Sequence, residues 1–494
     1  MSRLPHLALI GALTAAAAAA FMSTFTVQHS QPSWAGGFVV LALTVLASIL
    51  ALYGIRHYLF TLNRMFAPQR RTFEGLQAAQ WPKLVVFIAA HNEEAVIANC
   101  IEALLKSDYP RDRLLIVPVN DRSKDRTKEI CDEWAARNPR LLKPFHRTGG
   151  RPGKPAALMD AAAFAGPADV YVIFDADYIP GRGLLKQIVA PFLDPEVGVT
   201  MGRVVPCNAS TNLLTRLLDM ERSAGYQGDQ QARQNLRTLP QFGGTVGGIR
   251  VKALDAVGGF RQDVLAEDTD LTFRMLDRGW KVHYVNTAEC YEEVPEAWPV
   301  RVRQLQRWAK GHNQVMFSYL GRSLRNPHLR ASQRAEAVAL LCCYAVAPLT
   351  LVGWVLVLLS YFSSPSWLLT LTASSAALVA YGGFGNSAAF FQMAAAVRLD
   401  GKAQRLRLLP LNLVGYVVSA VTITRGCVNL VLDTLLSREL TWDKTVRFRK
   451  QSDAPAATAA PADQAASPPD VAAGAASAAA AAPSLACAPA AKKA

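Results

Sequence analysis

The sequence predicts an α/β domain with a mostly parallel sheet, flanked by transmembrane and interfacial helices. Hydrophobic residues make up 51% of the 494 residues and charged residues only 18%, below the roughly 25% that is usual in soluble domains. The longest apolar runs lie toward the two ends of the chain. Between them, in residues 80–300, short apolar runs alternate with stretches of helical spacing. This alternation is typical of a parallel sheet with helices on its faces.

Two apolar segments, residues 7–27 and 34–52, open the chain, and each is close to the ~20 residues needed to cross a bilayer. A cleaved signal peptide is an alternative for the first, because Arg3 precedes a stretch rich in small residues. A basic cluster follows the second segment and consists of Arg56, Arg64, Arg70 and Arg71. Basic residues favour the cytoplasmic side. We therefore expect an N-terminal membrane region over residues 1–72 and a cytoplasmic domain after it.

The predicted catalytic domain covers residues 80–296. Buried strands are expected over residues 84–88, 114–117 and 170–174, and helices over residues 93–106 and 124–137. Ligands of such domains bind at the C-terminal ends of the strands. Chemistry is therefore expected at that edge of the sheet.

Polar side chains follow each of these strands. Glu93 lies just beyond the first strand, Asp121 ends the second, and Asp175 and Asp177 follow the third. One such carboxylate usually caps a helix, but three strand ends in succession indicate a crevice for a base, a ribose and a metal. Asp175 and Asp177 would repel each other if buried without a cation. Their oxygens suit Mg²⁺ or Mn²⁺ bound to a diphosphate.

Two glycine-rich segments are candidates for ligand contact. Residues 149–154 end in Lys154 and precede a helical stretch. Their backbone amides, with Arg151 or Lys154, could bind phosphate, and an ordinary surface turn is an equal alternative. Residues 242–250 are rich in glycine, which permits close approach of the backbone to a ligand. A flexible loop is the alternative there.

Two further motifs follow in the second half of the domain and just after it. Glu267 and Asp268 precede a helical pattern, where Asp268 either caps the helix or acts as a general base. Gln304, Arg307 and Trp308 would share one face of a later helix. Arginine supplies a fork for diphosphate oxygens, and tryptophan an apolar platform for a sugar ring. Residues 297–334 are also expected to lie as an amphipathic segment on lipid headgroups.

A C-terminal membrane region is expected over residues 335–450. Residues 336–362 and 367–397 are two predicted spans. Residues 408–436 are long enough for a third, but Arg425 lies inside them, so a re-entrant or surface-lying helix is an open alternative. Residues 451–494 are an Ala/Pro-rich tail, disordered by composition.

The net charge of +14 is concentrated beside the apolar segments, in residues 56–71, 301–334, 398–407 and 438–450. It therefore indicates a cytoplasmic membrane surface. We find no basic patch with interleaved aromatic residues elsewhere, so we expect no nucleic-acid partner.

The ordered set of motifs resembles the membrane-embedded processive synthases of glycosyltransferase family 2, such as cellulose, hyaluronan, chitin and poly-N-acetylglucosamine synthases. The resemblance covers roughly residues 35 to 450. It rests on residues 88–94, Asn120–Asp121, Asp175–Asp177, 258–260, 266–271, 278–280, 304–308 and 442–445. Two departures are Asn120, where many members have aspartate, and Ala266, where many have threonine.

The resemblance implies a GT-A fold and a hexosyltransferase that inverts the anomeric carbon of a nucleotide-diphosphate sugar, usually UDP-linked. Asp121 would contact the base or ribose. Asp175 and Asp177 would hold the ribose and the metal-bound diphosphate, and Asp268 would deprotonate the acceptor. Gln304, Arg307 and Trp308 would hold the diphosphate and the acceptor sugar, and Glu93, Lys154 and Glu267 complete the expected substrate-binding set.

The predicted function is addition of sugars to a growing polysaccharide, with export along the same helices. The alternative acceptor is a polyprenyl phosphate or another lipid. A non-catalytic membrane protein is a third reading, and the intact Asp177 and Asp268 argue against it. The expected location is a bacterial-type inner (plasma) membrane, multi-pass, with a cytoplasmic catalytic domain in contact with membrane lipids. The sugar and any partner subunits stay open.

Overall fold

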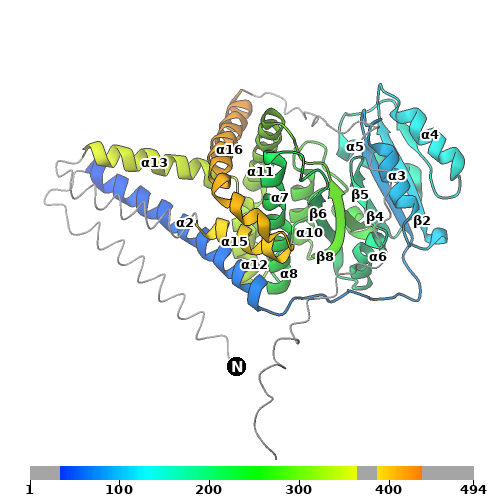
Figure 1. The fold of residues 1–494 in the computed structure, drawn as a ribbon, viewed down its shortest axis with the longest axis horizontal. Coiled ribbons are helices and arrows are strands. Elements are labelled where there is room, and N and C mark those ends of the chain that lie inside the picture. Colours follow the sequence, from blue (N-terminus) through cyan, green and yellow to red (C-terminus); the bar gives the residue numbers. More distant parts are fainter. Residues whose placement is uncertain (1–33, 364–386, 437–494) are drawn as a thin grey trace, which may run out of the picture. The chain divides into compact units, whose positions relative to one another are not determined.

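The computed structural model describes residues 34–363 and 387–436 (Figure 1), which belong to one compact unit. Several predicted features lie outside the described residues. These are the first apolar segment, residues 367–386 of the second C-terminal run, the motif at residues 442–445 and the tail.

An eight-stranded sheet forms the centre of the catalytic domain, in the order β3-β2-β1-β4-β7-β6-β8-β5. The strands are β1 (Leu84–Ala90), β2 (Leu114–Asp121), β3 (Phe145–Arg147), β4 (Val170–Asp175), β5 (Ile179–Pro180), β6 (Val197–Pro206), β7 (Gly247–Arg250) and β8 (Lys281–Glu292). The three predicted strands correspond to β1, β2 and β4. The predicted parallel pairing holds for β3, β2, β1 and β4. The sheet as a whole is mixed, because β7 runs antiparallel to both neighbours and β5 antiparallel to β8.

The register of the parallel half aligns the predicted strand ends. Ala89 of β1 pairs with Asp175 of β4, and Ala90 of β1 pairs with Asn120 of β2. The C-terminal ends of the three strands therefore lie level, at the edge where open α/β sheets bind ligands.

Short helices flank this sheet. They are α3 (Ile97–Leu105), α4 (Thr127–Arg137), α5 (Lys154–Ala165), α6 (Leu184–Val189), α7 (Leu213–Ser223), α8 (Gln231–Leu236), α9 (Val251–Ala256) and α10 (Glu267–Asp277), with 3₁₀ turns η1 (Arg111–Arg113) and η2 (Ala190–Leu193). The central strands are apolar on both faces and their side chains are almost fully buried, as expected for a sheet covered on two sides.

Helix α7 continues into α8 through η3 (Ala224–Gln230), a π-helical segment. Asn212 starts α7 with a capping box, in which its side chain accepts from the Thr215 N–H and the Thr215 hydroxyl accepts from the Asn212 N–H. A π-helical insertion is rare and is frequent at functional sites.

Helices outside the sheet domain are α2 (Trp34–Phe66), α11 (Trp298–Arg325), α12 (Ala331–Leu341), α13 (Val346–Ser363), α15 (Ser387–Leu399) and α16 (Asn412–Leu435), the last preceded by η5 (Ala403–Leu411). Among the described residues, Val45–Phe66 and Ala403–Leu435 are long and apolar enough to cross a membrane. In Figure 1, α16 lies beside α11, and α15 packs against α2.

The predicted span over residues 336–362 is not one straight helix. Helices α12 and α13 are separated by residues 342–345 and bent by 71°, so they form a third span only if the bent pair crosses as one. The break precedes Pro348, which lies inside α13. For residues 408–436, the length and composition of α16 agree with the spanning alternative, which stays a prediction.

Two arginines of the predicted basic cluster lie within the helix and not after it. The helix does not end near residue 52 but continues to Phe66, so Arg56 and Arg64 lie inside α2. Arg56 pairs with Glu336 of α12 at 2.8 Å and with Asp229 of η3 at 3.4 Å, and Arg64 donates to the Gln227 carbonyl at 2.5 Å. These two cations join α2 to neighbouring helices instead of facing lipid headgroups.

Candidate active site

A cavity of about 1950 Å³ opens at the C-terminal ends of β1, β2 and β4. Its lining includes every predicted site residue: Glu93, Asp121, Lys154, Asp175, Asp177, Glu267, Asp268, Gln304, Arg307 and Trp308. Pockets for one small ligand usually measure about 300–1,000 Å³. The cavity therefore has room for two ligands at once.

Asp121 lies at one end of the cavity with a carboxylate held on several sides. Its Oδ1 accepts from Arg122 Nε at 2.9 Å and from Arg147 Nη1 at 3.1 Å, and its Oδ2 accepts from the Gly153 N–H at 3.3 Å. Burial opposes ionisation, but the hydrogen bonds from Arg122 and Arg147 outweigh it and lower the pKa of Asp121. Asp121 is therefore a fixed anion, able to accept from a base or a ribose hydroxyl.

Arg147 was not predicted, because its short strand β3 carries no motif. The β2–β3 register places it directly opposite Asp121, and its Nε also pairs with Asp160 at 2.6 Å. It positions Asp121 from behind.

Asp175 is the last residue of β4, and Asp177 lies two residues beyond it and is only 4% exposed. Lys154 Nζ, at the start of α5, lies 2.6 Å from Asp175 Oδ1 and 2.9 Å from the Gly244 carbonyl. Burial would lower the pKa of Lys154, but the charges of Asp175 and Glu267 raise it. Lys154 is therefore a cation between carboxylates.

The donor set of Asp175 and Asp177 fits a hard cation that shares its shell with a ligand. Among the described residues, no group of three or more His, Cys, Asp or Glu side chains is placed to hold a metal. Two carboxylates supply hard oxygen ligands, and Mg²⁺ usually takes one or two carboxylates with phosphate oxygens and water. The arrangement suits a metal bound together with a diphosphate.

The first part of the predicted glycine-rich segment lies against Asp268, the predicted base. Gly244 has φ +78°, and a Cβ there would lie 3.3 Å from Asp268 Oδ2. Val246 has φ +50°, which is rare for a β-branched residue. Its N–H donates to the Ile173 carbonyl at 2.8 Å and its carbonyl accepts from the Gly202 N–H at 2.7 Å. The strained turn is thus fixed to β4 and β6.

The second part of that segment does not face a ligand. A Cβ on Gly247 would lie 2.5 Å from Phe242, and one on Gly248 would lie 2.7 Å from Phe192. These two glycines belong to β7 and allow aromatic side chains to pack onto the sheet, so the expected ligand approach is wrong for them.

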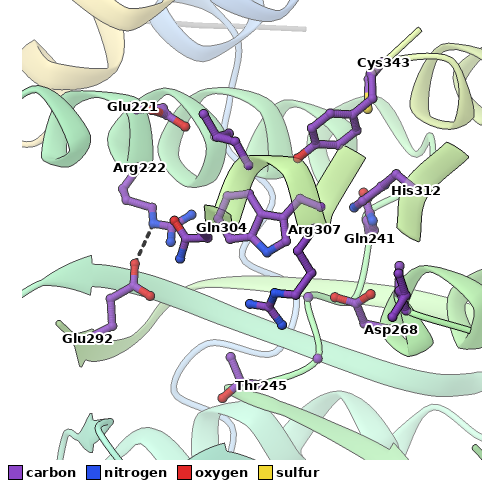
Figure 2. A pocket seen from close by; sticks show the side chains of 18 of the residues that line it. Glu221, Arg222, Gln241, Thr245, Asp268, Glu292, Gln304, Arg307, His312 and Cys343 are labelled. Carbon is purple, nitrogen blue, oxygen red and sulfur yellow. Dashed lines mark hydrogen bonds and ion pairs between the residues drawn. The ribbon is translucent and has the colours of Figure 1, made fainter. Parts of the chain in front are cut away.

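Glu267 and Asp268 form the first turn of α10. No described side chain caps this helix; Asp268 Oδ1 accepts instead from the Thr269 N–H at 2.6 Å. Burial, together with the nearby charge of Asp268, raises the pKa of Glu267 to about 7. Figure 2 shows Asp268 and Arg307 pointing into the same part of the cavity.

Trp308 is held between two guanidinium groups. Arg222 of α7 lies 5.4 Å and Arg301 of α11 lies 5.3 Å from the indole centroid, within range of a cation–π interaction. Arg222 Nε pairs with Glu292 Oε1 at 2.5 Å (Figure 2), and Arg301 donates to Gln304 Oε1 at 2.8 Å. Gln304 and Trp308 are therefore oriented by neighbouring cations.

Sequence reasoning missed Arg222, Glu292, Arg301 and His312, which all line this cavity. Two of them had a detectable signal: Arg301 lies three residues before Gln304 and His312 four residues after Trp308, so helical spacing puts them on the same face. Arg222 and Glu292 come from α7 and β8, and no pattern in the sequence links them to the site.

The cavity extends beyond Trp308 into the helices outside the sheet domain. Its far lining is mostly apolar and comes from α2, α13, α15 and α16: Leu50, Tyr53, Val346, Ala347, Phe390, Met393, Tyr416, Ala420 and Ile423. The predicted site residues and the apolar helices outside the sheet domain therefore line one cavity.

The family model described as "Glycosyltransferase like family 2" matches residues 82–311. Residues 82–311 form a family 2 glycosyltransferase domain. This glycosyltransferase domain has the predicted GT-A fold. The chain is similar over its fold to the mannosyltransferase PcManGT from Pyrobaculum calidifontis, solved in complex with GDP-Man and Mn²⁺, with a TM-score of 0.53 and 22% identity over 73% of this chain and 98% of that one.

Several curated glycosyltransferases are similar in sequence. The probable glycosyltransferase YdaM of Bacillus subtilis is 33% identical over 270 residues, 54% of this chain and 62% of that protein. Beta-monoglucosyldiacylglycerol synthase of Synechocystis is 31% identical over 304 residues, 61% of this chain and 62% of that protein. Glucomannan 4-beta-mannosyltransferase 7 of Arabidopsis thaliana is 30% identical over 261 residues, which are 51% of this chain and 46% of that protein. The chain thus spans less than two thirds of the length of each of these relatives.

Proposed function

We propose that the chain is an inverting membrane glycosyltransferase that moves a sugar from a nucleotide-diphosphate donor, UDP-linked, to a growing polysaccharide. The observation that carries the proposal is the single cavity that runs from Asp121, past Asp268, to Trp308 and the membrane helices. Such a transfer needs a donor at one end and an acceptor at the other, with the base between them. The catalytic domain would face the cytoplasm of a bacterial-type cell, because basic segments flank the apolar ones.

Asp268 carries the chemical step. It takes the proton of the acceptor hydroxyl as that oxygen attacks the anomeric carbon from the face opposite the diphosphate. The bond from the anomeric carbon to the diphosphate oxygen breaks as the new glycosidic bond forms, so one displacement inverts the configuration. Lys154 and Arg307 supply positive charge on the side of the leaving diphosphate.

Asp175 and Asp177 would hold a Mg²⁺ or Mn²⁺ ion, which when bound offsets charge on the leaving diphosphate. The fold neighbour from Pyrobaculum calidifontis was solved with Mn²⁺ and GDP-Man, which supports testing this ion and a guanine-linked donor. Asp121, with its carboxylate fixed by Arg147, would select the base or ribose.

A lipid acceptor is the second candidate. The far lining of the cavity favours it, because Leu50, Val346, Phe390, Met393 and Ile423 offer apolar contact, and burial of acyl chains contributes about 0.8 kcal/mol per CH₂. The relative named beta-monoglucosyldiacylglycerol synthase supports the same acceptor class.

One experiment separates the two acceptors. Membranes containing the chain are incubated with Mn²⁺ and radiolabelled UDP-glucose, UDP-N-acetylglucosamine or GDP-mannose, and products are divided by organic extraction and size. We expect label in a high-mass polymer with one donor, whereas label confined to a single-sugar lipid supports the second candidate. No transfer from any donor contradicts both.

The Asp268→Asn variant tests the mechanism in the same membranes. It keeps the size of the side chain and one acceptor oxygen but cannot act as a base, so turnover should be lost while UDP or GDP binding persists. Turnover at the wild-type rate would refute Asp268 as the base.

A further inference from the structure

His312 lies beside the catalytic centre on α11, four residues after Trp308. Its Nε2 is 3.4 Å from the Thr269 hydroxyl oxygen, and that oxygen is 3.3 Å from Asp268 Oδ1. In Figure 2, His312 stands near Gln241 and Asp268 at one side of the cavity. The Thr269 hydroxyl therefore bridges a carboxylate and an imidazole.

The hydroxyl proton of Thr269 can be donated either to the Asp268 carboxylate or to the His312 imidazole. Gln241 Nε2 donates to the hydroxyl oxygen at 2.8 Å, so that oxygen already accepts one bond. A threonine hydroxyl has one proton to donate. The acceptors beside it are Asp268 Oδ1 and His312 Nε2, and a proton leaving one can reach the other through this hydroxyl.

The rest of the imidazole has no comparable polar anchor. His312 Nδ1 is buried without a hydrogen-bond partner among the described residues, and the ring packs against Tyr344 at a centroid distance of 4.7 Å. Packing alone would be served by any flat apolar ring and would avoid a buried unsatisfied nitrogen, which costs about 1–3 kcal/mol. The nitrogen that faces Thr269 explains the choice of histidine.

We propose that His312 receives, through the Thr269 hydroxyl, the proton that Asp268 takes from the acceptor. The inference rests on the proposed role of Asp268 as the base. The Asp268 O–H bond breaks as the proton passes to the Thr269 oxygen, and the hydroxyl proton of Thr269 forms the N–H bond on His312. A carboxylate, an intact threonine and an imidazolium result, so the base is ready for the next transfer.

Burial favours the return step. It lowers the pKa of His312, against the opposing charge of Asp268, so the imidazole is neutral near pH 7 between turnovers and can accept a proton. The imidazolium then loses its proton to water in the cavity. The titratable groups that face it are Asp268 of α10 and Tyr344 between α12 and α13.

The test uses the full chain in detergent with Mn²⁺ and the radiolabelled donor that gives transfer in the panel above. His312→Ala and Thr269→Val should each lower kcat roughly 10- to 100-fold, less than the ~10²–10⁴-fold of a direct general base, with an unchanged KM for the donor. Thr269→Ser keeps the hydroxyl and should stay within about 2-fold of wild type by the same reasoning. Added imidazole should restore turnover to His312→Ala but not to Thr269→Val.

The double variant His312→Ala/Thr269→Val should be no slower than the slower single variant, because both interrupt one path. Wild-type kcat in His312→Ala, or a loss of kcat that imidazole does not relieve, overturns the inference. UDP and GDP binding, measured on each variant, identifies a fold defect. Turnover by Asp268→Asn would instead overturn the proposed base, so the two failures are distinguishable.

Discussion

The contact between Arg222 and Glu292 gives the most quantitative prediction. Arg222 Nε lies 2.5 Å from Glu292 Oε1, and Tyr178 donates its hydroxyl to Glu292 Oε2 at 2.9 Å. The side chain of Glu292 is 8% exposed and that of Arg222 is 20% exposed. Replacing Arg222 with methionine keeps an unbranched side chain but leaves Glu292 as a buried carboxylate without its cation.

The expected cost follows from that burial. Removing one partner of a buried ion pair costs about 3–5 kcal/mol, and the partial exposure of Arg222 favours the lower end. Arg222→Met also loses its cation–π contact with Trp308, worth about 0.5–1 kcal/mol at an exposed site. A domain of 150–250 residues loses about 2–4 °C of Tm per kcal/mol. A total loss of about 3.5–4 kcal/mol should therefore make Arg222→Met unfold roughly 7–16 °C below wild type.

A matched double variant separates the stranded charge from the lost contact. Arg222→Met/Glu292→Gln removes both charges and keeps an oxygen acceptor for Tyr178. Its Tm should return to within roughly 4 °C of wild type, because only the smaller cation–π contribution is missing. Tm is measured by intrinsic tryptophan fluorescence in detergent. If the double variant unfolds at or below the Tm of Arg222→Met, the buried-charge explanation is refuted.

Three further predictions concern the catalytic centre. Gly244→Ala should reduce turnover because its Cβ would meet Asp268. Gly258→Ala is the control: Gly258 has a similar φ of +80° and nothing described within 4 Å of its Cβ position, so this variant should show only the backbone strain of about 1–2 kcal/mol that both share. Equal kcat in the two variants would contradict a role for the contact with Asp268. Glu267 has a folded pKa of about 7 against an ordinary 4.5, so stability should fall as pH rises through that window, by up to about 1.4 kcal/mol per unit, and Glu267→Gln should flatten Tm against pH. EDTA should stop transfer, and Asp177→Asn should raise the Mn²⁺ concentration that restores it; full activity in EDTA would remove the metal from the mechanism.

The gathering of residues at the proposed nucleotide end of the cavity could be predicted from sequence because its parts are local. Asp121 and Asp175 each end a strand whose apolar residues identify it, and parallel pairing forces such ends to the same edge. Lys154 was predictable for a similar reason, since it begins the helix that follows a glycine-rich turn. The chemistry depended on residue type and short-range pattern, and both are visible in a single chain.

The proposed acceptor end of the cavity was less predictable because it is assembled from distant elements. Trp308 was identified by its motif, but Arg222, one of the two cations beside its ring, comes from α7. Arg222 in turn pairs with Glu292 of β8, 70 residues away in sequence. The Thr269 contact with His312 likewise spans 43 residues. No local periodicity encodes such pairs, because they depend on how α10 and α11 pack in three dimensions.

Sequence also does not show how closely the predicted membrane region and catalytic domain are joined. Asp229 of η3 is an example. Its carboxylate pairs with Arg56 of α2 at 3.4 Å and with Arg233 of α8 at 3.3 Å, and accepts from Gln392 of α15 at 2.7 Å. Tyr226, three residues earlier in η3, lines the catalytic cavity. One π-helical segment thus contacts α2 and α15 and also lines the cavity. Because separating these partly buried ion pairs would leave charges unpaired, a movement of α2 or α15 should also displace the segment that lines the cavity. The two regions that sequence pattern separates are therefore joined by ion pairs and hydrogen bonds across their predicted boundary.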